Sequence, residues 1–248
     1  MIASAYLAAE DFCESLAQEL ALSGRRVSGW HGRLALSPDP PAPAAWALEV
    51  WTAPQEIAVA SVKSAADALR AIQRNWALYG AAHHRRAALI AERLPPVKAR
   101  PLAFPEPAPT GHLGAWTLLT PDRMLASATK TSPFVNGAVQ FVEDKAGPPS
   151  RAYLKLWEAL TLLGVHPGPG DYCLVLGAAP GGWSWVIAKL GAQVVAVDKA
   201  PIDADVLAMQ GVSQRLESAF GIEPRGETRV DWLFSDVICY PSRLLALV

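Results

Sequence analysis

Hydrophobic residues near the start of the chain recur every four positions. They are Phe12, Leu16 and Leu20. Because this spacing lines one face of a helix, and because Gly24 follows as a C-cap signal, we predict an amphipathic helix over Glu10–Leu22. The pattern then changes to alternation. The segments 26–37 and 45–62 are predicted to be rich in strands, with a proline-rich loop between them.

The pattern up to residue 140 predicts two further helices and two further strands. The helices are expected over Ser64–Tyr79 and His84–Leu94, and the second is ended by a pair of prolines. Residues 101–109 contain four prolines in nine positions, which predicts an extended connector. Short strands are expected near Gly114–Leu119 and Arg123–Ala128. This mixture predicts a compact α+β domain over residues 1–140.

The pattern of hydrophobic and polar residues changes after the Gly-Pro-Pro-Ser turn at residues 147–150. Ser150 is expected to N-cap a helix that runs to Leu163 with a hydrophobic face. Two entirely apolar segments, Tyr172–Leu176 and Gln193–Val197, then flank a glycine loop and a predicted helix over Trp183–Leu190. Strands that are apolar on both faces are typical of a buried parallel sheet. We therefore predict an α/β domain over residues 141–248 with a Rossmann-like βαβ unit.

The glycine loop and a following aspartate form a candidate cofactor site. The loop residues are Gly177, Ala178, Ala179, Pro180, Gly181, Gly182 and Trp183. Asp198 ends the next strand, where a carboxylate can accept hydrogen bonds from both hydroxyls of an adenosine ribose. The structural alternative is a glycine turn that only allows tight packing, with Asp198 as a cap.

The positions of the glycines bear on which cofactor fits. A pyrophosphate-binding loop has the pattern G-x-G-x-x-G. In this chain Ala179 occupies the position of the second glycine, and the rigid Pro180 follows it. NAD is therefore disfavoured. S-adenosylmethionine has no phosphate and needs only a close backbone approach to its amino-acid tail, which glycines allow.

Three motifs in the second half resemble those of the FtsJ-like ribose 2′-O-methyltransferases. They are the cofactor loop Gly177–Ser184, the segment Pro149–Glu158, which resembles the family's catalytic helix, and Asp231–Val237, which resembles its fourth strand. Within the family, the chain looks most like the bacterial enzymes that methylate a cytidine ribose of 23S ribosomal RNA and carry an N-terminal THUMP region. The chain departs from the family pattern at Val175, where an acidic residue is usual.

The resemblance implies particular site residues. In the family's Lys-Asp-Lys-Glu tetrad, Lys155 matches the first lysine and Asp236 the aspartate. Lys155 would act as a base, which requires a lowered pKa, and Asp236 would orient it and face the cofactor. The adenine is expected near Glu217 and Ser218. The structural alternatives are a solvent-exposed ion pair between Lys155 and Glu158, and a role of Asp236 as the cap of the following helix.

The resemblance also implies that the family pattern continues beyond this chain. The second lysine and the glutamate of the tetrad have no counterpart before Val248, so we expect a truncated form of a longer pattern with weak or no activity by itself. The predicted function is S-adenosylmethionine-dependent methylation of an rRNA ribose 2′-hydroxyl, by this protein or one of which it is the N-terminal part. The alternatives are a noncatalytic RNA-binding or cofactor-binding remnant and, more distantly, a dinucleotide-dependent oxidoreductase.

Composition and charge limit the kind of RNA contact. The 248 residues carry a net charge of −1, so attraction to RNA has to be concentrated locally. The segment 83–100 holds five Lys or Arg against one acid, and Arg151 is expected to extend its strip. The predicted RNA-binding residues are Arg85, Arg86, Arg93, Lys98, Arg100 and Arg151.

The remaining composition points to an ordinary globular protein. No long apolar run predicts a membrane span, and the first residues lack a basic leader, so we expect a cytoplasmic protein. The three cysteines have neither zinc spacing nor an even disulfide pattern, and we expect them to be reduced and no metal to be bound.

Overall fold

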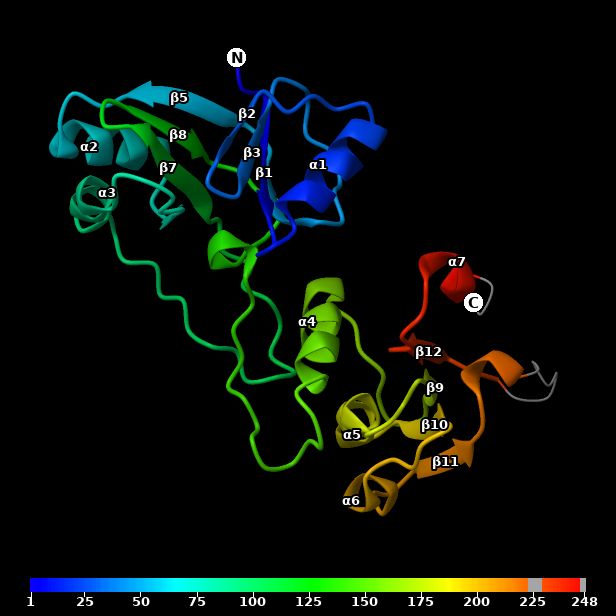
Figure 1. The fold of residues 1–248 in the computed structure, drawn as a ribbon. Helices are drawn as coiled ribbons and strands as arrows, with labels where there is room; N and C mark the ends of the chain where they lie inside the picture. Colours follow the sequence, from blue (N-terminus) through cyan, green and yellow to red (C-terminus); the bar gives the residue numbers. More distant parts are fainter. Residues whose placement is uncertain (223–228, 246–248) are drawn as a thin grey trace. The chain divides into compact units, whose positions relative to one another are not determined.

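The computed structural model describes residues 1–222 and 229–245, and the chain divides into two units (Figure 1). The first contains residues 1–101 and 109–140, and the second contains residues 102–108 and 141–248. The sequence placed the whole connector in the first domain. Residues 102–108 instead associate with the second unit, where the Val142 N–H donates to the Leu102 carbonyl at 2.9 Å.

The first unit begins with a four-stranded antiparallel sheet. The strands are β1 (Ser4–Ala8), β2 (Gly29–His31), β3 (Leu34–Ser37) and β4 (Ala47–Trp51), in the order β2-β3-β1-β4. Helix α1 (Cys13–Leu22) packs Leu16 and Leu20 against Tyr6 and Ala8 of the central strand. All five residues of β1 are buried, because the opposite face of the strand is covered as well.

A second sheet in the same unit carries the other two predicted helices. The strands are β5 (Pro54–Ala58), β6 (Trp76–Leu78), β7 (Gly114–Thr120) and β8 (Arg123–Ser127), in the order β5-β8-β7-β6. Only β6 and β7 pair in parallel. Helices α2 (Val62–Ile72) and α3 (His84–Ala91) pack on this sheet through Leu69 and Ile90, and η1 (Val135–Gly137) follows β8. The predicted strands near 114–119 and 123–128 are confirmed.

The prediction of a helix continuing to Tyr79 is wrong. Helix α2 ends at Ile72 because Gln73 is fully extended, with φ −161° and ψ 174°. Trp76 then pairs with Gly114, and its indole N–H donates back to the Leu69 carbonyl at 2.9 Å. A run of three apolar residues has no measurable period, so pairing with a strand far along the chain decides its structure.

The second unit contains a parallel sheet, and the predicted βαβ unit is confirmed. Its strands are β9 (Tyr172–Leu176), β10 (Gln193–Asp198), β11 (Val212–Leu216) and β12 (Trp232–Ser235), in the order β11-β10-β9-β12. The helices are α4 (Tyr153–Leu163), α5 (Gly182–Lys189), α6 (Ala204–Leu207) and α7 (Pro241–Leu245), with η2 (Ala219–Gly221) after β11. Among the described residues, no helix is long and apolar enough to cross a membrane.

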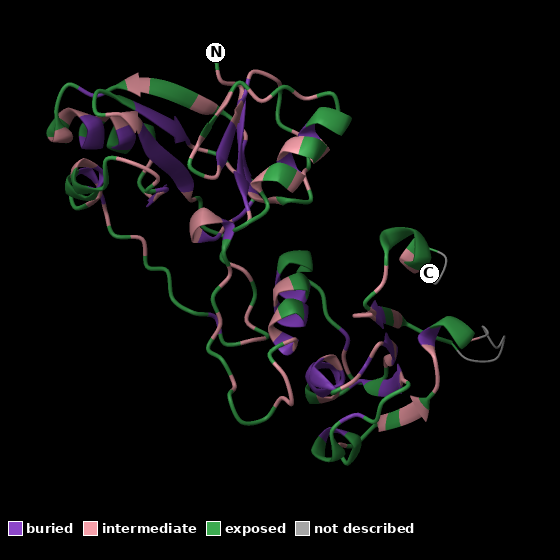
Figure 2. Cartoon of the chain, viewed as in Figure 1, coloured by how far each residue is buried: buried purple, intermediate pink, exposed green. Residues whose placement is uncertain are grey.

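Helix α4 begins later than the sequence predicted. Its N-cap is Ala152, which makes no side-chain cap, and Ser150 lies before the helix. The helix buries one face and exposes the other (Figure 2). On the buried face, Trp157 stacks on Phe104 of the connector at 5.0 Å between ring centroids and meets Tyr153 edge-on at 4.6 Å. This aromatic cluster fixes α4 and the connector together within the second unit.

Candidate functional site

The candidate site lies at the carboxyl ends of the parallel strands. After β9 the chain proceeds to β10 and β11 on one side, and later returns to β12 on the other side of β9. Ligands of open α/β sheets bind at such a topological switch point. Backbone hydrogen bonds tie the strand ends together here. The Gly177 N–H donates to the Val197 carbonyl at 2.9 Å, and the Asp236 N–H donates to the Leu176 carbonyl at 3.0 Å.

The glycine loop requires its glycines for different reasons. Gly177 and Gly181 have φ of +72° and +117°, which disfavours any residue with a side chain. A Cβ on Gly177 would also approach the Val237 backbone to 3.0 Å, and one on Gly182 would approach the Ser150 Oγ to 2.8 Å. The loop therefore leaves backbone close to its neighbours, and the Trp183 indole donates to the Ala152 carbonyl at 2.9 Å.

Asp198 faces the glycine loop from the next strand. Its Oδ2 accepts from the Ala179 N–H, and its Oδ1 accepts from the Ala200 N–H, both at 3.0 Å. A carboxylate offers about four lone-pair positions, so two hydrogen bonds leave acceptor capacity for a ligand's hydroxyl groups. The alternative of a purely structural loop anchor explains the two backbone contacts but leaves that capacity unused.

The residues predicted to surround an adenine follow β11. The Glu217 N–H donates to the Asp198 carbonyl at 3.1 Å, which fixes this turn beside the candidate ribose site. The Glu217 side chain pairs with Arg215, and Ser218 is the N-cap of η2. Leu216, at the end of the strand, is exposed. Adenine contact with Glu217 or Ser218 stays a prediction.

Lys155 and Asp236 lie together although they are distant in sequence. Lys155 lies on α4 and Asp236 directly follows β12, and the Lys155 Nζ is 3.4 Å from the Asp236 Oδ1. The Lys155 side chain is 68% exposed, so it lacks the burial that the sequence analysis expected of a base. Among the described contacts Lys155 pairs with Asp236 rather than with Glu158. Helix α7 begins only at Pro241, which leaves Asp236 too far upstream to cap it.

Three further polar side chains near the loop were not predicted. The hydroxyl oxygens of Ser150, Ser184 and Ser235 are buried and have no hydrogen-bond partner among the residues that the structure describes. Ser150 lies against Gly182, Ser184 lies in α5, and Ser235 immediately precedes Asp236. Glu158 of α4, in contrast to these serines, is a titratable residue. It is half-buried, and this burial raises the pKa of its carboxyl. A lone serine gives no signal in a sequence, so only the fold identifies these groups.

The six predicted RNA-binding residues fall into separate places. Arg85 and Arg86 lie on α3, Arg93 follows it, and Lys98 and Arg100 lie on the extended stretch beyond. Arg86 has an acidic neighbour. The pKa of Asp122 is lowered first by a hydrogen bond from Thr120, and then by smaller effects that include Arg86. A common RNA surface therefore stays a prediction.

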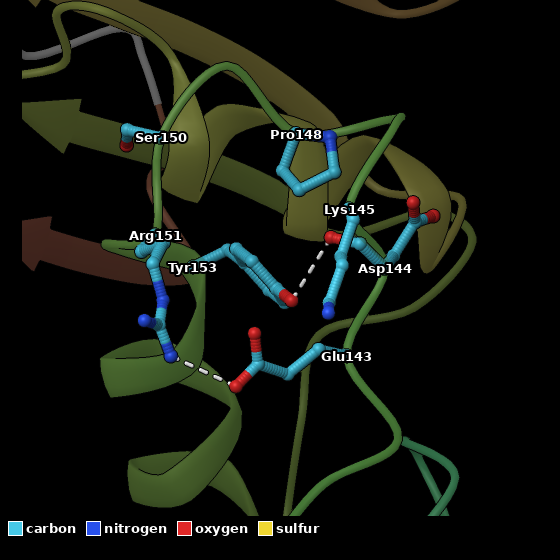
Figure 3. Close-up of a pocket in the computed structure, with 7 residues that line it drawn as sticks. All are labelled: Glu143, Asp144, Lys145, Pro148, Ser150, Arg151 and Tyr153. Atoms are coloured by element: carbon cyan, nitrogen blue, oxygen red, sulfur yellow. Dashed lines mark hydrogen bonds and ion pairs between the residues drawn. The ribbon is translucent and has the colours of Figure 1, made fainter.

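Arg151 belongs to the second unit and is engaged locally. Figure 3 shows its guanidinium pointing toward Glu143, to which it donates at 2.8 Å, while the Tyr153 hydroxyl donates to the Asp144 carbonyl at 3.0 Å. Ser150 points away from this pair. The contact with Glu143 neutralises part of the charge that the sequence analysis assigned to RNA.

Comparison with known proteins concerns mainly the second unit. Residues 148–242 match the FtsJ-like methyltransferase family. The chain is 41% identical over 103 residues to "Ribosomal RNA large subunit methyltransferase M" of Halorhodospira halophila. This aligned region covers 40% of this chain and 30% of that protein. The protein of the same name from Alkalilimnicola ehrlichii is 37% identical over 131 residues, covering 50% and 35%. The matched region spans about a third of the length of these relatives.

Solved structures add little. A predicted N6-adenine-specific DNA methylase from Listeria monocytogenes has a TM-score of 0.33 and 9% identity, over 99% of this chain and 83% of that one. A score at this level supports no conclusion about fold or function.

Proposed function

We propose that this chain, whose residues 148–242 form an FtsJ-like methyltransferase domain, acts in the S-adenosylmethionine-dependent methylation of a ribose 2′-hydroxyl of ribosomal RNA. The observation that carries the proposal is the Lys155–Asp236 pair at 3.4 Å, placed at the strand ends beside the glycine loop. The relatives named as ribosomal RNA methyltransferases support the substrate class. The proposal implies a cytoplasmic protein that meets the large-subunit RNA.

The residues present fit S-adenosylmethionine. Asp198 retains acceptor capacity for a ribose, and Gly177 and Gly182 keep the loop free of side chains where a Cβ would collide. The partnerless hydroxyl of Ser150 lies against Gly182, where the loop enters α5. At this helix start the backbone N–H groups lack intrahelical partners, which favours a carboxylate such as that of an amino-acid tail.

The chemistry requires few protein groups. When bound, the cofactor would supply a methyl group on a sulfonium, and its sulfur would remain as a neutral thioether once the methyl–sulfur bond is replaced by a bond to the ribose oxygen. The Lys155 Nζ, as the neutral amine, would take the hydroxyl proton and become an ammonium, and the Asp236 carboxylate would hold that lysine at the strand end. A positioned base typically contributes about 10²- to 10⁴-fold in rate. In the observed exposed arrangement, RNA bound over Lys155 would exclude water from it.

Methylation is best tested in cells, where the protein acts at its natural length. The gene that encodes this chain is deleted, and 23S ribosomal RNA fragments are compared by mass spectrometry. We expect loss of one ribose methyl group, its restoration by the wild-type gene, and no restoration by Lys155→Met or Asp236→Asn. An unchanged methylation pattern after deletion would contradict the proposal and favour a noncatalytic binding protein.

Cofactor binding is tested separately on the purified chain. Replacing Asp198 by Ala removes the acceptors for two ribose hydroxyls, and hydrogen bonds to charged groups contribute about 1.5–3 kcal/mol. We therefore expect affinity for S-adenosylmethionine in calorimetry to fall about 10- to 150-fold.

The matched control is Asp205→Ala, which removes an exposed carboxylate from α6 of the same unit and should leave affinity unchanged. Melting temperatures show whether Asp198→Ala still folds despite losing its contacts to Ala179 and Ala200. Equal affinity of Asp198→Ala and the parent would exclude this cofactor site.

A further inference from the structure

The first unit contains a cavity of about 780 Å³ that the proposed methyltransferase site does not use. This volume is in the range of ligand-binding pockets, about 300–1,000 Å³. The lining comes from five segments on four connections of the chain, together with Leu48 of β4. The segments supply Arg33 between β2 and β3, Arg74 and Asn75 before β6, residues 96–100 after α3, residues 109 and 111–113 before β7, and residues 133–136, 138 and 140 after β8.

The charge of this lining is of one sign. It includes four cationic side chains and one imidazole, and no Asp or Glu is among the lining residues that the structure describes. The positive or titratable residues are Arg33, Arg74, Lys98, Arg100 and His112. Like charges around one cavity repel each other, and an anionic ligand removes that repulsion.

Three exposed cations elsewhere in the unit have acidic partners. Arg26 pairs with Asp39, Arg70 with Asp67, and Arg123 with Glu56. In contrast, Arg74 and Lys98 are exposed and make no ion pair among the described contacts. The Arg33 guanidinium donates to a backbone carbonyl, that of Ala8, at 2.5 Å. The cavity therefore concentrates positive charge in a chain with a net charge of −1.

Two details of the lining suit a nucleotide better than a simple anion. The cations come from three places around the cavity, namely Arg33, Arg74 and the stretch with Lys98 and Arg100, as needed for successive phosphates rather than for one. His112 is exposed, and its backbone carbonyl accepts from the Asn75 side chain at 3.3 Å, which anchors this residue at the cavity. An imidazole can stack on an unpaired base, and single-stranded RNA is recognised by such stacking together with phosphate contacts.

We propose that this cavity binds a single-stranded segment of RNA, with Arg33, Arg74, Lys98 and Arg100 facing the phosphates and His112 stacking on a base. The inference rests on the proposed function, because it names the part of the chain that would hold the RNA substrate. It shares Lys98 and Arg100 with the sequence-based surface but leaves out Arg85, Arg86 and Arg93, which do not line the cavity.

The test measures binding of a short fluorescein-labelled single-stranded RNA to the purified chain over a series of salt concentrations. The double variant Arg74→Gln/Lys98→Gln should flatten the slope of log K against log salt by about 1.4, since each lost phosphate contact contributes about 0.7. The matched control, Arg85→Gln/Arg93→Gln, removes the same charge from α3 and its end and should leave the slope unchanged. His112→Ala should weaken binding about 5- to 150-fold at every salt concentration.

The outcomes separate this inference from the proposed function. Parental slope and affinity in the cavity variant, or loss of slope only in the α3 variant, would overturn the cavity site and leave methylation to the cellular test. Displacement of the RNA by polyglutamate as effectively as by unlabelled RNA would also overturn it. Since Arg74 and Lys98 are exposed, an unchanged melting temperature is expected and shows that the variant is folded.

Discussion

The chain contains two lysine–carboxylate pairs whose members are 81 residues apart, and they behave in opposite ways. In the first unit, the side chains of Lys130 and Glu49 are 1% and 0% exposed. In the second unit, those of Lys155 and Asp236 are 68% and 34% exposed, with their charged atoms 3.4 Å apart. The same two kinds of side chain thus form a buried structural contact in one unit and an open contact at the candidate site in the other.

The buried pair is completed by its surroundings. After β8 the chain runs antiparallel to β4, with Lys130 opposite Trp51 and the Thr131 N–H donating to the Val50 carbonyl at 3.0 Å. Glu49 also accepts from the Trp51 indole at 2.8 Å, and Lys130 also donates to the Phe134 carbonyl. Burial lowers the pKa of Lys130, while the Glu49 carboxylate opposes that shift.

Among the described residues, the side chains of the open pair, Lys155 and Asp236, make no further hydrogen bonds of this kind. The difference indicates which of the two pairs is available for chemistry. Removing one partner of a buried pair is strongly destabilising, because it leaves an uncompensated charge in the interior. An exposed pair contributes only about 0–1 kcal/mol to stability and can be rearranged by a ligand. The two pairs can therefore be told apart by what their removal does to folding.

The largest effect is expected from Lys130→Met. This change leaves the Glu49 carboxylate buried without its cation, and breaking a buried pair in this way costs about 3–5 kcal/mol. Urea unfolding of the first unit, followed by the fluorescence of buried Trp51 and Trp116, measures the loss in free energy of unfolding.

The matched control is the double variant Lys130→Met/Glu49→Gln. It removes both charges and keeps an acceptor for the Trp51 indole, so it should recover most of the lost stability. If the single variant is as stable as the parent, the buried pair does not stabilise the fold and the comparison fails.

The sequence predicted one of these pairs and not the other. Lys155 and Asp236 were joined because motifs of a family place them, one on a helix and one at a strand end. Nothing in the periodicity around Glu49 or Lys130 indicates contact, since it depends on the segment after β8 pairing with β4. For the same reason Arg33 and Arg74 were missed, because the cavity forms only where separate connections meet.

Local signals account for most of the correctly predicted elements. The apolar strands Tyr172–Leu176 and Gln193–Asp198 and the glycine loop between them are specified by neighbouring residues. Val175, the departure from the family pattern, is fully buried in β9 and belongs to the hydrophobic core of the second unit. By contrast, the strand at Trp76–Leu78 depends on pairing with the distant strand β7, which no local pattern encodes.

A smaller effect on folding is expected from Lys155→Met, which makes the same chemical change at the open pair. We expect the free energy of unfolding to change by no more than about 1 kcal/mol, because water replaces the lost partner of Asp236. Urea unfolding under the conditions used for Lys130→Met measures it. A loss of stability comparable to that of Lys130→Met would mean that Lys155 is a structural residue, and would weaken its assignment as a base.

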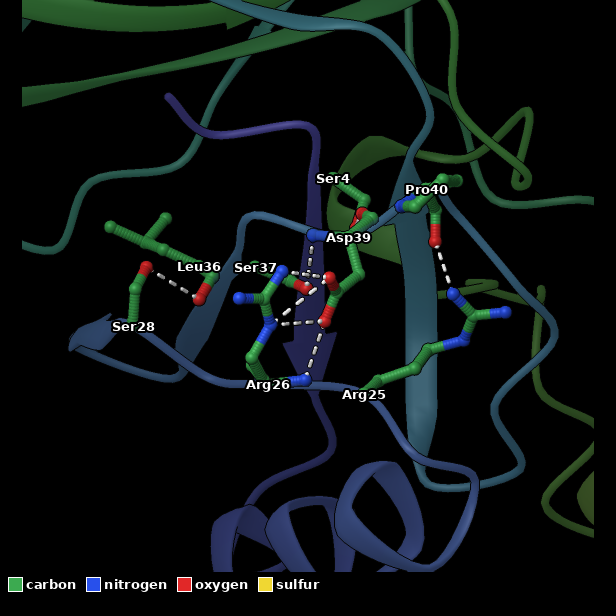
Figure 4. Close-up of polar contacts among 8 residues, drawn as sticks. All are labelled: Ser4, Arg25, Arg26, Ser28, Leu36, Ser37, Asp39 and Pro40. Atoms are coloured by element: carbon green, nitrogen blue, oxygen red, sulfur yellow. Dashed lines mark hydrogen bonds and ion pairs between the residues drawn. The ribbon is translucent and has the colours of Figure 1, made fainter.

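The smallest effect is expected at a third ion pair, between Arg26 and Asp39, whose contribution to stability depends on pH. Arg26 donates to Asp39 through its backbone N–H at 2.7 Å and its guanidinium at 2.5 Å, and Figure 4 shows these contacts converging on the carboxylate. The side-chain hydrogen bond from Arg26 is the main reason that the pKa of Asp39 is lowered from 3.8 to about 2. Since the folded pKa is below the unfolded value, the contribution to stability is present above pH 3.8 and is lost as pH falls toward about 2.

Urea unfolding of the parent and of Asp39→Asn should therefore differ at neutral pH and converge across that acid range. The control is Asp67→Asn, which removes the exposed carboxylate paired with Arg70. A parent–variant difference that persists unchanged at the acid end of the range would show that ionisation of Asp39 does not stabilise the fold.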